Sequence, residues 1–326
     1  MSTSANRIGI LTSGGDAPGM NAAIRAAVRT AHSFGIECVG IRRGYSGLIN
    51  GDFLPLGEKD VKGITGRGGT MLFTARSEEF MTDEGQKRAV DTCKYMGIDG
   101  LIVIGGDGTF RGALKLAELG LNVVGVPCTI DNDIGSTSYT IGFDTACNTA
   151  IEAVDKISDT MQSHERCSVV EVMGRRTGHL AVNVGIATGA TVTLIPEVPI
   201  DFERDVIDRI RTARLAGRSH FTVIVAEGID PLHVIAEKIN ASTGIETRIT
   251  ALGHIQRGGA PLVRDRVTAT NMGYRAVEIL QQGNGGRIIG MRGDACVDIE
   301  IHEAMSMEKE FDYAAYRMLT QLTFLE

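Results

Sequence analysis

A glycine-rich segment, residues 105–109 (Gly-Gly-Asp-Gly-Thr), lies between an apolar run and a helical pattern over residues 110–119. Glycines let the backbone turn tightly and approach a ligand, so that its N–H groups can point at phosphate oxygens. The helix adds the positive end of its dipole at the same place. The carboxylate of Asp107 is a ligand of the kind that Mg²⁺ takes in proteins. The segment therefore predicts a phosphate site with a magnesium ion, and an ordinary strand-to-helix turn is the alternative.

A second polar segment, residues 129–133 (Thr-Ile-Asp-Asn-Asp), places two carboxylates two residues apart directly after an apolar run. Such a pair can supply a general base and a metal-linked partner. Phosphoryl transfer to a hydroxyl needs the base only to accept a proton late in the reaction. By itself the segment is also typical of a polar turn. Beside the glycine-rich segment it indicates phosphoryl transfer.

Cations must be concentrated locally if this chain binds phosphates, because its net charge is −7. Bidentate arginines bind a phosphomonoester well. Taken singly, each arginine is typical of a solvated surface, and Arg257, which Gly258 and Gly259 follow, is the strongest single candidate. The cationic candidates are Arg166, Arg175, Arg176, Arg248, His254 and Arg257.

The elements that must position these residues are buried strands alternating with helices. Apolar runs without alternating polar residues predict strands that are buried on both faces. Helical patterns between them, such as residues 21–31 and 202–216, predict an α/β fold with a mostly parallel sheet covered on both sides. The predicted strands are residues 8–12, 101–104, 123–126, 169–172 and 221–226.

Each polar segment begins where a predicted strand ends. Ligands of open α/β sheets bind beyond the carboxyl ends of the strands. If the strands are parallel, all five segments converge on one edge of the sheet. The sequence has neither the Walker pattern nor the dinucleotide glycine pattern, so a nucleotide must be bound by another design. The five segments are residues 13–16, 105–109, 129–133, 174–176 and 227–228.

Composition narrows the classes of protein that fit. A chain of 326 residues predicts one large or two medium domains. The sequence lacks a basic run interleaved with aromatic residues, so nucleic-acid binding is not expected. It also lacks an apolar run of transmembrane length and the pattern of a signal peptide. The six cysteines form no CxxC pair, which favours free thiols in a reducing compartment. We therefore expect a cytoplasmic protein without a membrane or nucleic-acid partner.

Five motifs carry a resemblance to a known family. They are Leu-Thr-Ser-Gly-Gly-Asp-Ala-Pro-Gly-Met-Asn at 11–21, Ile-Gly-Gly-Asp-Gly at 104–108, Thr-Ile-Asp-Asn-Asp at 129–133, Val-Met-Gly-Arg at 172–175 and Leu-Gly-His-Ile-Gln-Arg-Gly-Gly at 252–259. Together they closely resemble the bacterial-type ATP-dependent 6-phosphofructokinases over about residues 7–300.

The resemblance implies a fold and an activity. It implies two α/β domains with mostly parallel sheets flanked by helices and an active site in the cleft between them. Residues 1–142 plus about 257–306 would bind ATP, and residues 143–256 plus about 307–326 would bind the sugar phosphate. The implied reaction is the transfer of the γ-phosphate of Mg-ATP to the 1-hydroxyl of fructose 6-phosphate in glycolysis. A homotetramer with active sites shared between subunits is implied as well.

The resemblance also implies roles for individual residues. Asp131 would accept the proton of the sugar hydroxyl, with Thr129 and Arg175 near the transferred phosphoryl group, and Asp107 would hold Mg²⁺. Arg166 and Arg248 would reach in from a neighbouring subunit. The implied ATP-binding residues are Gly15, Arg76, Ser77, Gly106, Asp107, Gly108, Thr109 and Gly112. The implied substrate-binding residues are Thr129, Ile130, Asp131, Arg166, Met173, Gly174, Arg175, Glu227, Arg248, His254 and Arg257.

A second, regulatory site is implied at Arg25, Arg29, Gly189 and Arg218. Regulated relatives of this kind bind ADP or phosphoenolpyruvate there with cations. This chain departs from them at Glu58, Ser158, Ala216 and Thr191, although a shift of one residue would place Lys59 at the first of these positions. The departures predict a weak or different response to those effectors.

The phosphoryl donor depends on two positions. Pyrophosphate users tend to carry aspartate at position 108 and lysine at position 128, whereas this chain has Gly108 and Cys128, which favours ATP. A pyrophosphate-dependent enzyme and a non-catalytic sugar-phosphate sensor remain alternatives. NAD and lipid kinases share the Gly-Gly-Asp-Gly-Thr segment, but the cationic stretch 248–257 argues against them.

Overall fold

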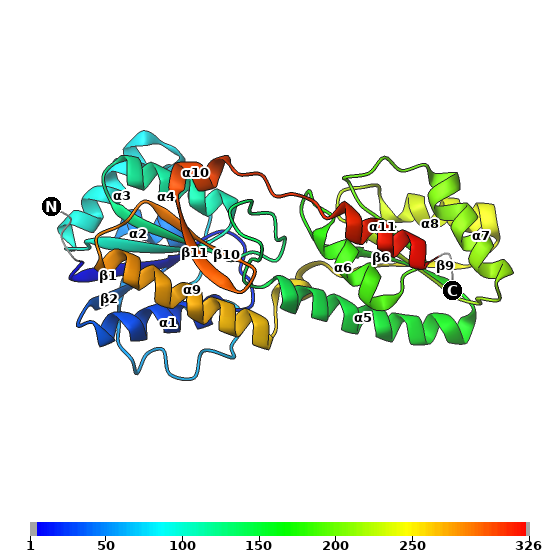
Figure 1. The fold of residues 1–326 in the computed structure, drawn as a ribbon, viewed down its shortest axis with the longest axis horizontal. Coiled ribbons are helices and arrows are strands. Elements are labelled where there is room, and N and C mark those ends of the chain that lie inside the picture. The colour runs from blue at the N-terminus through cyan, green and yellow to red at the C-terminus, as the bar shows by residue number, and fades with distance from the viewer. Residues whose placement is uncertain (1–4, 324–326) are drawn as a thin grey trace. The chain divides into compact units, whose positions relative to one another are not determined.

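Strands and helices alternate along the chain and form two compact units. The computed structural model describes residues 5–323 (Figure 1). The first unit contains residues 5–145 and 257–309, and the second contains 146–256 and 310–323. The chain therefore passes from one unit to the other after Thr145, Gln256 and Lys309. Which unit binds ATP and which binds the sugar phosphate stays a prediction.

The first unit is built on a seven-stranded sheet with the order β11-β10-β5-β4-β1-β2-β3. Its central strands are parallel, and β3 and β11 are antiparallel to their neighbours at the two edges. The pairs Thr12↔Ile104 and Gly105↔Pro127 bring the carboxyl ends of β1, β4 and β5 to the same level. The strands are β1 Arg7–Thr12, β2 Glu37–Ile41, β3 Phe53–Leu56, β4 Gly100–Gly105, β5 Asn122–Pro127, β10 Arg287–Arg292 and β11 Ala295–Glu300.

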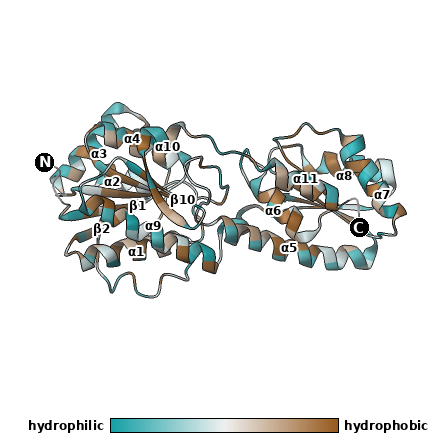
Figure 2. Ribbon diagram, viewed as in Figure 1, coloured by the Kyte–Doolittle hydropathy of each residue, from teal (hydrophilic) through white to brown (hydrophobic). Residues whose placement is uncertain are grey.

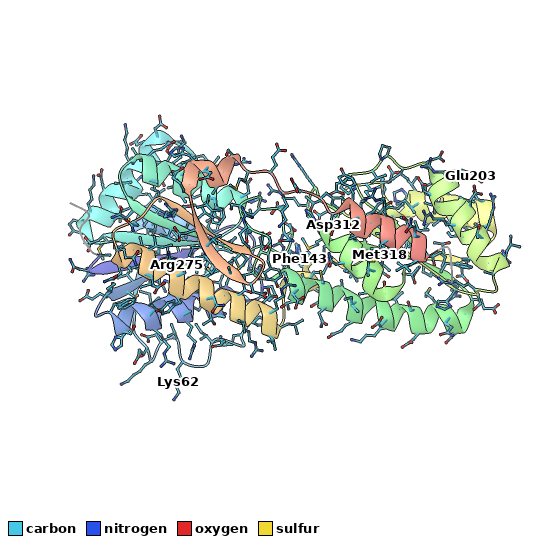
Figure 3. The ribbon with its side chains drawn as sticks, in the orientation of Figure 1. Lys62, Phe143, Glu203, Arg275, Asp312 and Met318 are labelled. Carbon is cyan, nitrogen blue, oxygen red and sulfur yellow. The ribbon has the colours of Figure 1, made fainter. Side chains whose placement is uncertain are left out.

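Helices cover both faces of this sheet (Figure 1). On one face α1 and α9 lie side by side, and on the other α4 lies beside α3 and α10. Figure 2 shows brown strands between helices that carry teal residues. Arg275 of α9, labelled in Figure 3, donates a hydrogen bond of 2.7 Å to Asp298 of β11. The helices are α1 Met20–Ser33, α2 Gly44–Asn50, α3 Asp83–Tyr95, α4 Asp107–Glu118, α9 Val263–Gln281 and α10 Ile301–Ser306, with a short 3₁₀ turn η1 at Glu79–Met81.

The second unit is built on a four-stranded parallel sheet with the order β7-β8-β6-β9. Apolar residues of β6, β7 and β8 pack with those of α7 and α8 in one buried cluster. The strands are β6 Cys167–Val172, β7 Val192–Leu194, β8 Phe221–Ala226 and β9 Thr247–Ala251. The helices are α6 His179–Thr188, a π-helical turn η2 at Glu203–Ile207, α7 Asp208–Leu215, α8 Leu232–Thr243, a 3₁₀ turn η3 at Gly253–Arg257 and α11 Tyr313–Leu322.

The helix that carries the chain between the units is α5, Phe143–His164. It begins at Phe143 (Figure 3), where the sequence predicted the domain boundary. The five predicted strands and the predicted α/β class with mostly parallel sheets are confirmed. Across residues 5–323, every helix is too short or too polar to cross a membrane.

The prediction that all five polar segments converge on one edge of one sheet is wrong. The strands β1, β4 and β5 belong to the first unit, whereas β6 and β8 belong to the second. Buried parallel strands have similar apolar sequences whichever sheet they join, so the pattern does not distinguish one sheet from two. The polar segments accordingly form two groups, three in the first unit and two in the second.

Candidate active site

The glycine-rich segment joins β4 to α4 in the first unit. The helix begins at Asp107, and Gly106 precedes it in an extended conformation. The Asp107 side chain is 29% exposed, and one of its oxygens lies 2.8 Å from Arg111, one turn further along the helix. A carboxylate at the start of a helix, open to solvent and close to the first N–H groups, fits a magnesium ion that also binds phosphate oxygens.

A metal at this place would take most of its ligands from elsewhere. Within residues 5–323 no three histidine, cysteine, aspartate or glutamate side chains cluster closely enough to hold a metal ion. Mg²⁺ commonly binds through one or two carboxylates, with water and substrate phosphates completing its coordination. The single carboxylate of Asp107 therefore fits a metal that arrives with a nucleotide.

Hydrogen bonds hold the three strand ends of the first unit together. The Ser13 N–H donates to the carbonyl of Ile104 at 3.0 Å, and the Thr109 hydroxyl donates to the carbonyl of Ser13 at 3.1 Å. The Cys128 N–H donates to the carbonyl of Gly105 at 2.9 Å. The segments after β1, β4 and β5 are therefore held as one surface.

The segment that carries Arg76 and Ser77 contacts this surface. The Thr74 hydroxyl donates to the carbonyl of Gly14 at 2.7 Å. Arg76 is exposed, and the Ser77 hydroxyl accepts a hydrogen bond from the Phe80 N–H at 3.3 Å. Both predicted ATP residues thus lie on a loop that is tied to the end of β1.

Arg257 lies against the first glycine-rich turn. Its Nη1 donates to the carbonyl of Asp16 at 3.3 Å, and a Cβ atom at Gly15 would lie only 2.2 Å from that same nitrogen. Glycine at position 15 therefore leaves room for a guanidinium directly against the backbone. The sequence predicted Arg257 for the sugar phosphate, and the structure places it beside the predicted ATP segment.

The predicted base and its partner form a hydrogen-bonded pair after β5. The Asp131 N–H donates to the Thr129 hydroxyl at 3.2 Å, and the Thr129 hydroxyl lies 3.3 Å from Asp131 Oδ2. Both residues are buried. Thr129 is also next to the glycine-rich loop, since a Cβ atom at Gly106 would lie 3.6 Å from the Thr129 Cβ. A proton acceptor is thus fixed beside the predicted phosphate loop.

Two residues of the predicted catalytic segments have an unusual backbone. Asn132 has a φ of 51° and Arg175 a φ of 60°. Residues other than glycine rarely adopt this left-handed region, and the conformation is costly unless surrounding contacts hold it. For Asn132 the contacts include a hydrogen bond of 3.1 Å from the Thr140 N–H to its side-chain oxygen. Such strain is typical of functional loops.

The two positions that predict the donor are both compatible with a nucleotide. A Cβ atom at Gly108 would meet no atom within 4 Å, so the space beside the loop is open. Cys128 is fully buried, and burial, with the charges of Asp265 and Asp16, raises the pKa of its thiol well above the usual value. Cys128 therefore stays neutral and places no charge beside a phosphate.

In the second unit the two arginines predicted to cross a subunit boundary share one carboxylate. Arg166 Nε lies 2.7 Å from one oxygen of Glu246, and Arg248 pairs with the other. The hydrogen bond from Arg166 lowers the pKa of Glu246, with smaller contributions from the charges of both arginines. Glu246 was not among the predicted site residues. The available signal was an acidic residue two positions before Arg248, immediately before the edge strand β9.

The ends of β6 and β8 carry the remaining predicted substrate residues. The Glu227 N–H donates to the carbonyl of Val172 at 2.9 Å, so Glu227 lies beside the start of the segment that holds Met173, Gly174 and Arg175. Burial, together with the charge of Glu227, raises the pKa of Glu171 in β6. These strand ends therefore form a compact polar group of their own.

A buried glutamine that was not among the predicted site residues links this group to η3. The Gln256 side chain accepts a hydrogen bond from the Met173 N–H at 3.3 Å and donates to the carbonyl of Gly253 at 3.1 Å. Gln256 is fully buried, whereas His254 in the same turn is exposed. The sequence signal that could have identified Gln256 is its uncharged amide side chain within the motif at residues 252–259, where glycines flank His254 and Arg257.

The predicted effector residues are divided between the units. Arg25 and Arg29 lie on α1, whereas Gly189 ends α6 and Arg218 follows α7. Glu58 approaches Arg29, with 3.7 Å between Nε and a carboxylate oxygen, and its other oxygen lies 3.9 Å from His32. Glu58 therefore places a negative charge beside one of the predicted effector cations.

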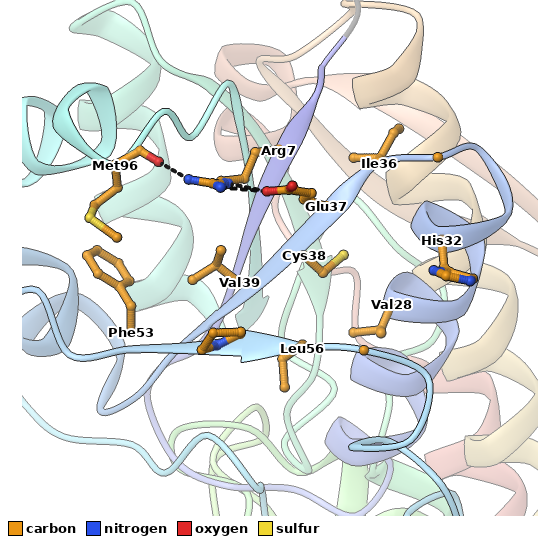
Figure 4. A pocket seen from close by; sticks show the side chains of 13 residues that line it. Arg7, Val28, His32, Ile36, Glu37, Cys38, Val39, Phe53, Leu56 and Met96 are labelled. Atoms are coloured by element: carbon orange, nitrogen blue, oxygen red, sulfur yellow. Dashed lines mark hydrogen bonds and ion pairs between the residues drawn. The ribbon is translucent and has the colours of Figure 1, made fainter.

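A groove of about 730 Å³ lies elsewhere on the first unit, at the beginning of β2 (Figure 4). Apolar side chains dominate its lining, and the guanidinium of Arg7 is bonded to Glu37 at 2.8 Å and to the carbonyl of Met96 at 2.6 Å. The Arg7 guanidinium in this groove is thus already hydrogen-bonded within the protein. None of the predicted active-site residues lines it.

Comparison with known proteins gives a consistent result. The phosphofructokinase family matches residues 7–280. The chain is 50% identical to the ATP-dependent 6-phosphofructokinase of Clostridium tetani over 318 residues, which cover 98% of this chain and 99% of that protein. The structure of phosphofructokinase from Saccharomyces cerevisiae superimposes with a TM-score of 0.86 at 34% identity, over 98% of this chain and 47% of that one.

A pyrophosphate-dependent phosphofructokinase from Marinobacter aquaeolei has the same fold. It superimposes with a TM-score of 0.86 at 19% identity, over 98% of this chain and 92% of that one. The fold alone therefore does not distinguish the two donors. The match over most of the chain and the identity to the clostridial protein establish that the chain belongs to the phosphofructokinase family.

Proposed function

We propose that the chain transfers the γ-phosphoryl group of ATP to the 1-hydroxyl of fructose 6-phosphate, giving fructose 1,6-bisphosphate and ADP. The observation that carries the proposal is the Thr129–Asp131 pair, which lies buried beside the glycine-rich loop at the joined ends of β1, β4 and β5. The identity to a clostridial ATP-dependent 6-phosphofructokinase supports the choice of donor and acceptor.

Asp131 acts as the general base in this reaction. Its backbone N–H and carboxylate are both tied to the Thr129 hydroxyl, which fixes the direction of the carboxylate. The carboxylate accepts the proton of the sugar hydroxyl as the bond to phosphorus forms. Positioning and charge stabilisation supply most of the catalysis in phosphoryl transfer, so a correctly placed base matters more than a strong one.

The nucleotide is held by the glycine-rich loop and its neighbours. The first N–H groups of α4 point toward the phosphates, and the open space at Gly108 admits them. Asp107 would hold Mg²⁺, and the bound ion would neutralise charge on the phosphate oxygens. Arg257, bonded to the carbonyl of Asp16, adds a cation on the same surface.

The sugar phosphate is bound by residues of the second unit together with Thr129, Ile130, Asp131 and Arg257. Arg175 stabilises the charge on the transferred group, and His254 with the arginines binds the phosphate already present on the sugar. The proposed substrate residues of the second unit are Arg166, Met173, Gly174, Arg175, Glu227, Arg248 and His254. We also propose a cytoplasmic location and a place in glycolysis for the enzyme.

A coupled assay tests the donor and the acceptor together. Purified protein is given fructose 6-phosphate with Mg-ATP or with pyrophosphate. We expect turnover with ATP and none above background with pyrophosphate. Turnover with pyrophosphate alone would contradict the assignment that rests on Gly108, and tight sugar-phosphate binding without turnover on either donor would indicate a sensor.

We propose a homotetramer in which each active site combines Asp131 of one subunit with Arg248 of its neighbour. Arg248→Ala and Asp131→Asn subunits are unfolded together, mixed in equal amounts and reassembled. Random pairing gives about one site in four with both residues intact, so we expect about a quarter of wild-type activity. Each variant reassembled alone is the control. Activity of the mixture no higher than the mean of the two controls would show that the site is not shared.

We expect a weak response to phosphoenolpyruvate and ADP. Glu58 lies beside Arg29, and hydrogen bonds from cations to a charged ligand contribute about 1.5–3 kcal/mol each, so lost cations weaken an anion site strongly. Each effector is titrated at sub-saturating fructose 6-phosphate, and the half-saturation is expected to shift less than about twofold. The variant Glu58→Lys is the matched comparison and should respond more. A large shift in the unmodified protein would show that the site is intact.

A further inference from the structure

The segment at the end of the first unit packs against the loop that follows the predicted base. A Cβ atom at Gly135 would lie 2.2 Å from the carbonyl oxygen of Met307 and 2.6 Å from the carbonyl carbon of Glu308. No side chain fits between two backbones at that distance, so glycine is required there. Residues 307–309 thus lie directly on the loop formed by residues 132–137.

Lys309 extends this contact into the loop. Its ammonium group donates to the carbonyl of Thr137 at 2.6 Å and to Asn132 Oδ1 at 3.5 Å. Lys309 is half-buried, so these hydrogen bonds form partly out of water, where a charged donor interacts more strongly. It therefore binds both ends of residues 132–137, a loop that lies 172 or more positions earlier in the chain.

The residue that Lys309 reaches has a left-handed backbone. Asn132 has a φ of 51°, directly after Asp131, and its side-chain oxygen also accepts a hydrogen bond from the Thr140 N–H at 3.1 Å. Asparagine tolerates the left-handed region better than most residues, and contacts to its side chain select that conformation over the others it can adopt. Three donors surround the Asn132 oxygen: the N–H and the hydroxyl of Thr140, and the ammonium group of Lys309. Together they restrain the side chain of Asn132.

The hydrogen bonds continue from Asn132 to the base. The Thr140 hydroxyl donates to the carbonyl of Thr129 at 2.7 Å and lies 3.4 Å from Asn132 Oδ1. The Thr129 hydroxyl in turn binds Asp131. A displacement of Asn132 would therefore move both residues of the catalytic pair.

Burial of an ammonium group is unfavourable at this position. Desolvation, with a smaller contribution from the charge of Arg292, lowers the pKa of Lys309 to about 8, and the charge of Asp133 acts in the opposite direction. A neutral side chain would avoid this cost. The lysine is thus held where its hydrogen bonds to the loop compensate for lost hydration.

We propose that Lys309 is a positioning residue for the catalytic segment 129–133, holding Asn132 in its left-handed conformation and so fixing the Asp131 carboxylate. It does not touch the reacting atoms. The inference rests on the proposed phosphoryl transfer from ATP to fructose 6-phosphate. Lys309 is the last residue of the first unit. The point at which the chain leaves this unit is therefore also the point that fixes the geometry of the catalytic segment.

The first test is Lys309→Met, which keeps the length of the side chain and removes the donor. We expect kcat to fall about 10- to 100-fold, the usual effect of misplacing a catalytic group, while KM for both substrates stays within about threefold. Lys309→Arg, which keeps the charge and the donors, is expected to recover part of kcat. Lys94→Met, which removes an exposed lysine on α3, is the control and should retain wild-type kcat.

A double-mutant cycle separates positioning from general stability. Asn132→Gly tolerates the left-handed backbone but removes the oxygen that Lys309 binds. If Lys309 acts through Asn132, Lys309→Met lowers kcat much less in the Asn132→Gly background than in the wild type. A purely structural role would give the same reduction in both backgrounds. Thermal unfolding of each variant is followed in parallel.

The outcomes distinguish this inference from the proposed function. Absence of ATP-dependent turnover in the unmodified enzyme would overturn the function itself. Normal turnover in the unmodified enzyme with a wild-type kcat in Lys309→Met would overturn only the positioning role. If Lys309→Met does not fold, Lys309→Gln, which keeps an uncharged donor, takes its place. A loss of folding in both variants would show that Lys309 is structural and would also overturn the inference.

Discussion

Asp131→Asn is expected to lower kcat by about 10²–10⁴-fold, the range that general acid–base catalysis contributes. The substitution keeps the shape of the side chain, and the bond from the backbone N–H of residue 131 to Thr129 is unaffected. What is lost is the ability to accept a proton. Because that interaction is made in the transition state, KM for fructose 6-phosphate should change far less than kcat.

Steady-state kinetics with each substrate varied in turn measure the effect. Asp91→Asn is the matched control, since Asp91 is an exposed aspartate on α3 whose side chain is 76% accessible. It should leave both constants at their wild-type values. A wild-type kcat in Asp131→Asn would remove Asp131 from the mechanism, and a large rise in KM at constant kcat would make it a binding residue instead.

Asp265→Ala is expected to destabilise the first unit by about 3–5 kcal/mol, because each buried donor left without an acceptor costs about 1–3 kcal/mol. Asp265 is fully buried. Its carboxylate accepts hydrogen bonds from the Tyr139 hydroxyl at 2.5 Å, the Gly142 N–H at 2.7 Å, and the N–H and hydroxyl of Thr145 at 2.9 and 2.5 Å. Burial raises the pKa of Asp265, and these bonds counteract the rise.

The place of Asp265 in the chain explains why the loss should be large. Asp265 lies in the first turn of α9, soon after the chain returns to the first unit at Arg257. It binds the segment that leads up to Thr145, where the chain leaves the first unit. Asp265 therefore joins two of the places where the chain crosses between the units. Denaturant unfolding followed by circular dichroism measures the change. Asp265→Asn, which keeps one acceptor oxygen, should be intermediate. A loss below about 1 kcal/mol in Asp265→Ala would show that water replaces the carboxylate.

The elements that carry strong local signals in the sequence were predicted correctly. The strands β1, β4, β5, β6 and β8 are mostly apolar and mostly buried, so the pattern and the structure agree. The strands β2, β3, β7, β9, β10 and β11 were not predicted; the short and edge strands among them depend on the neighbour with which they pair. The strand pattern alone did not divide the strands between two sheets, because buried parallel strands have similar apolar sequences whichever sheet they join; only the family resemblance implied two domains.

The residues of the candidate site also divide into those with a local sequence signal and those whose role depends on contacts with residues far away in the sequence. Segments 105–109 and 129–133 were recognised because glycines and carboxylates stand together in the sequence. Glu246, Gln256 and Lys309 were not recognised, because each acquires its role through a partner that the fold brings close. Lys309 and Asn132, for example, are 177 positions apart. A single lysine in a polar tail carries no local sign of such a contact.

The most direct measurement of the central claim follows the phosphoryl group itself by phosphorus NMR. Enzyme, Mg²⁺, ATP and fructose 6-phosphate are mixed, and the γ-phosphate resonance of ATP is followed with those of the sugar phosphates. We expect the γ-phosphate signal to be replaced by a second phosphomonoester signal of fructose 1,6-bisphosphate, in equal amounts and with no free phosphate. Loss of the γ-phosphate signal to inorganic phosphate, or no change while pyrophosphate supports the same product, would contradict the account.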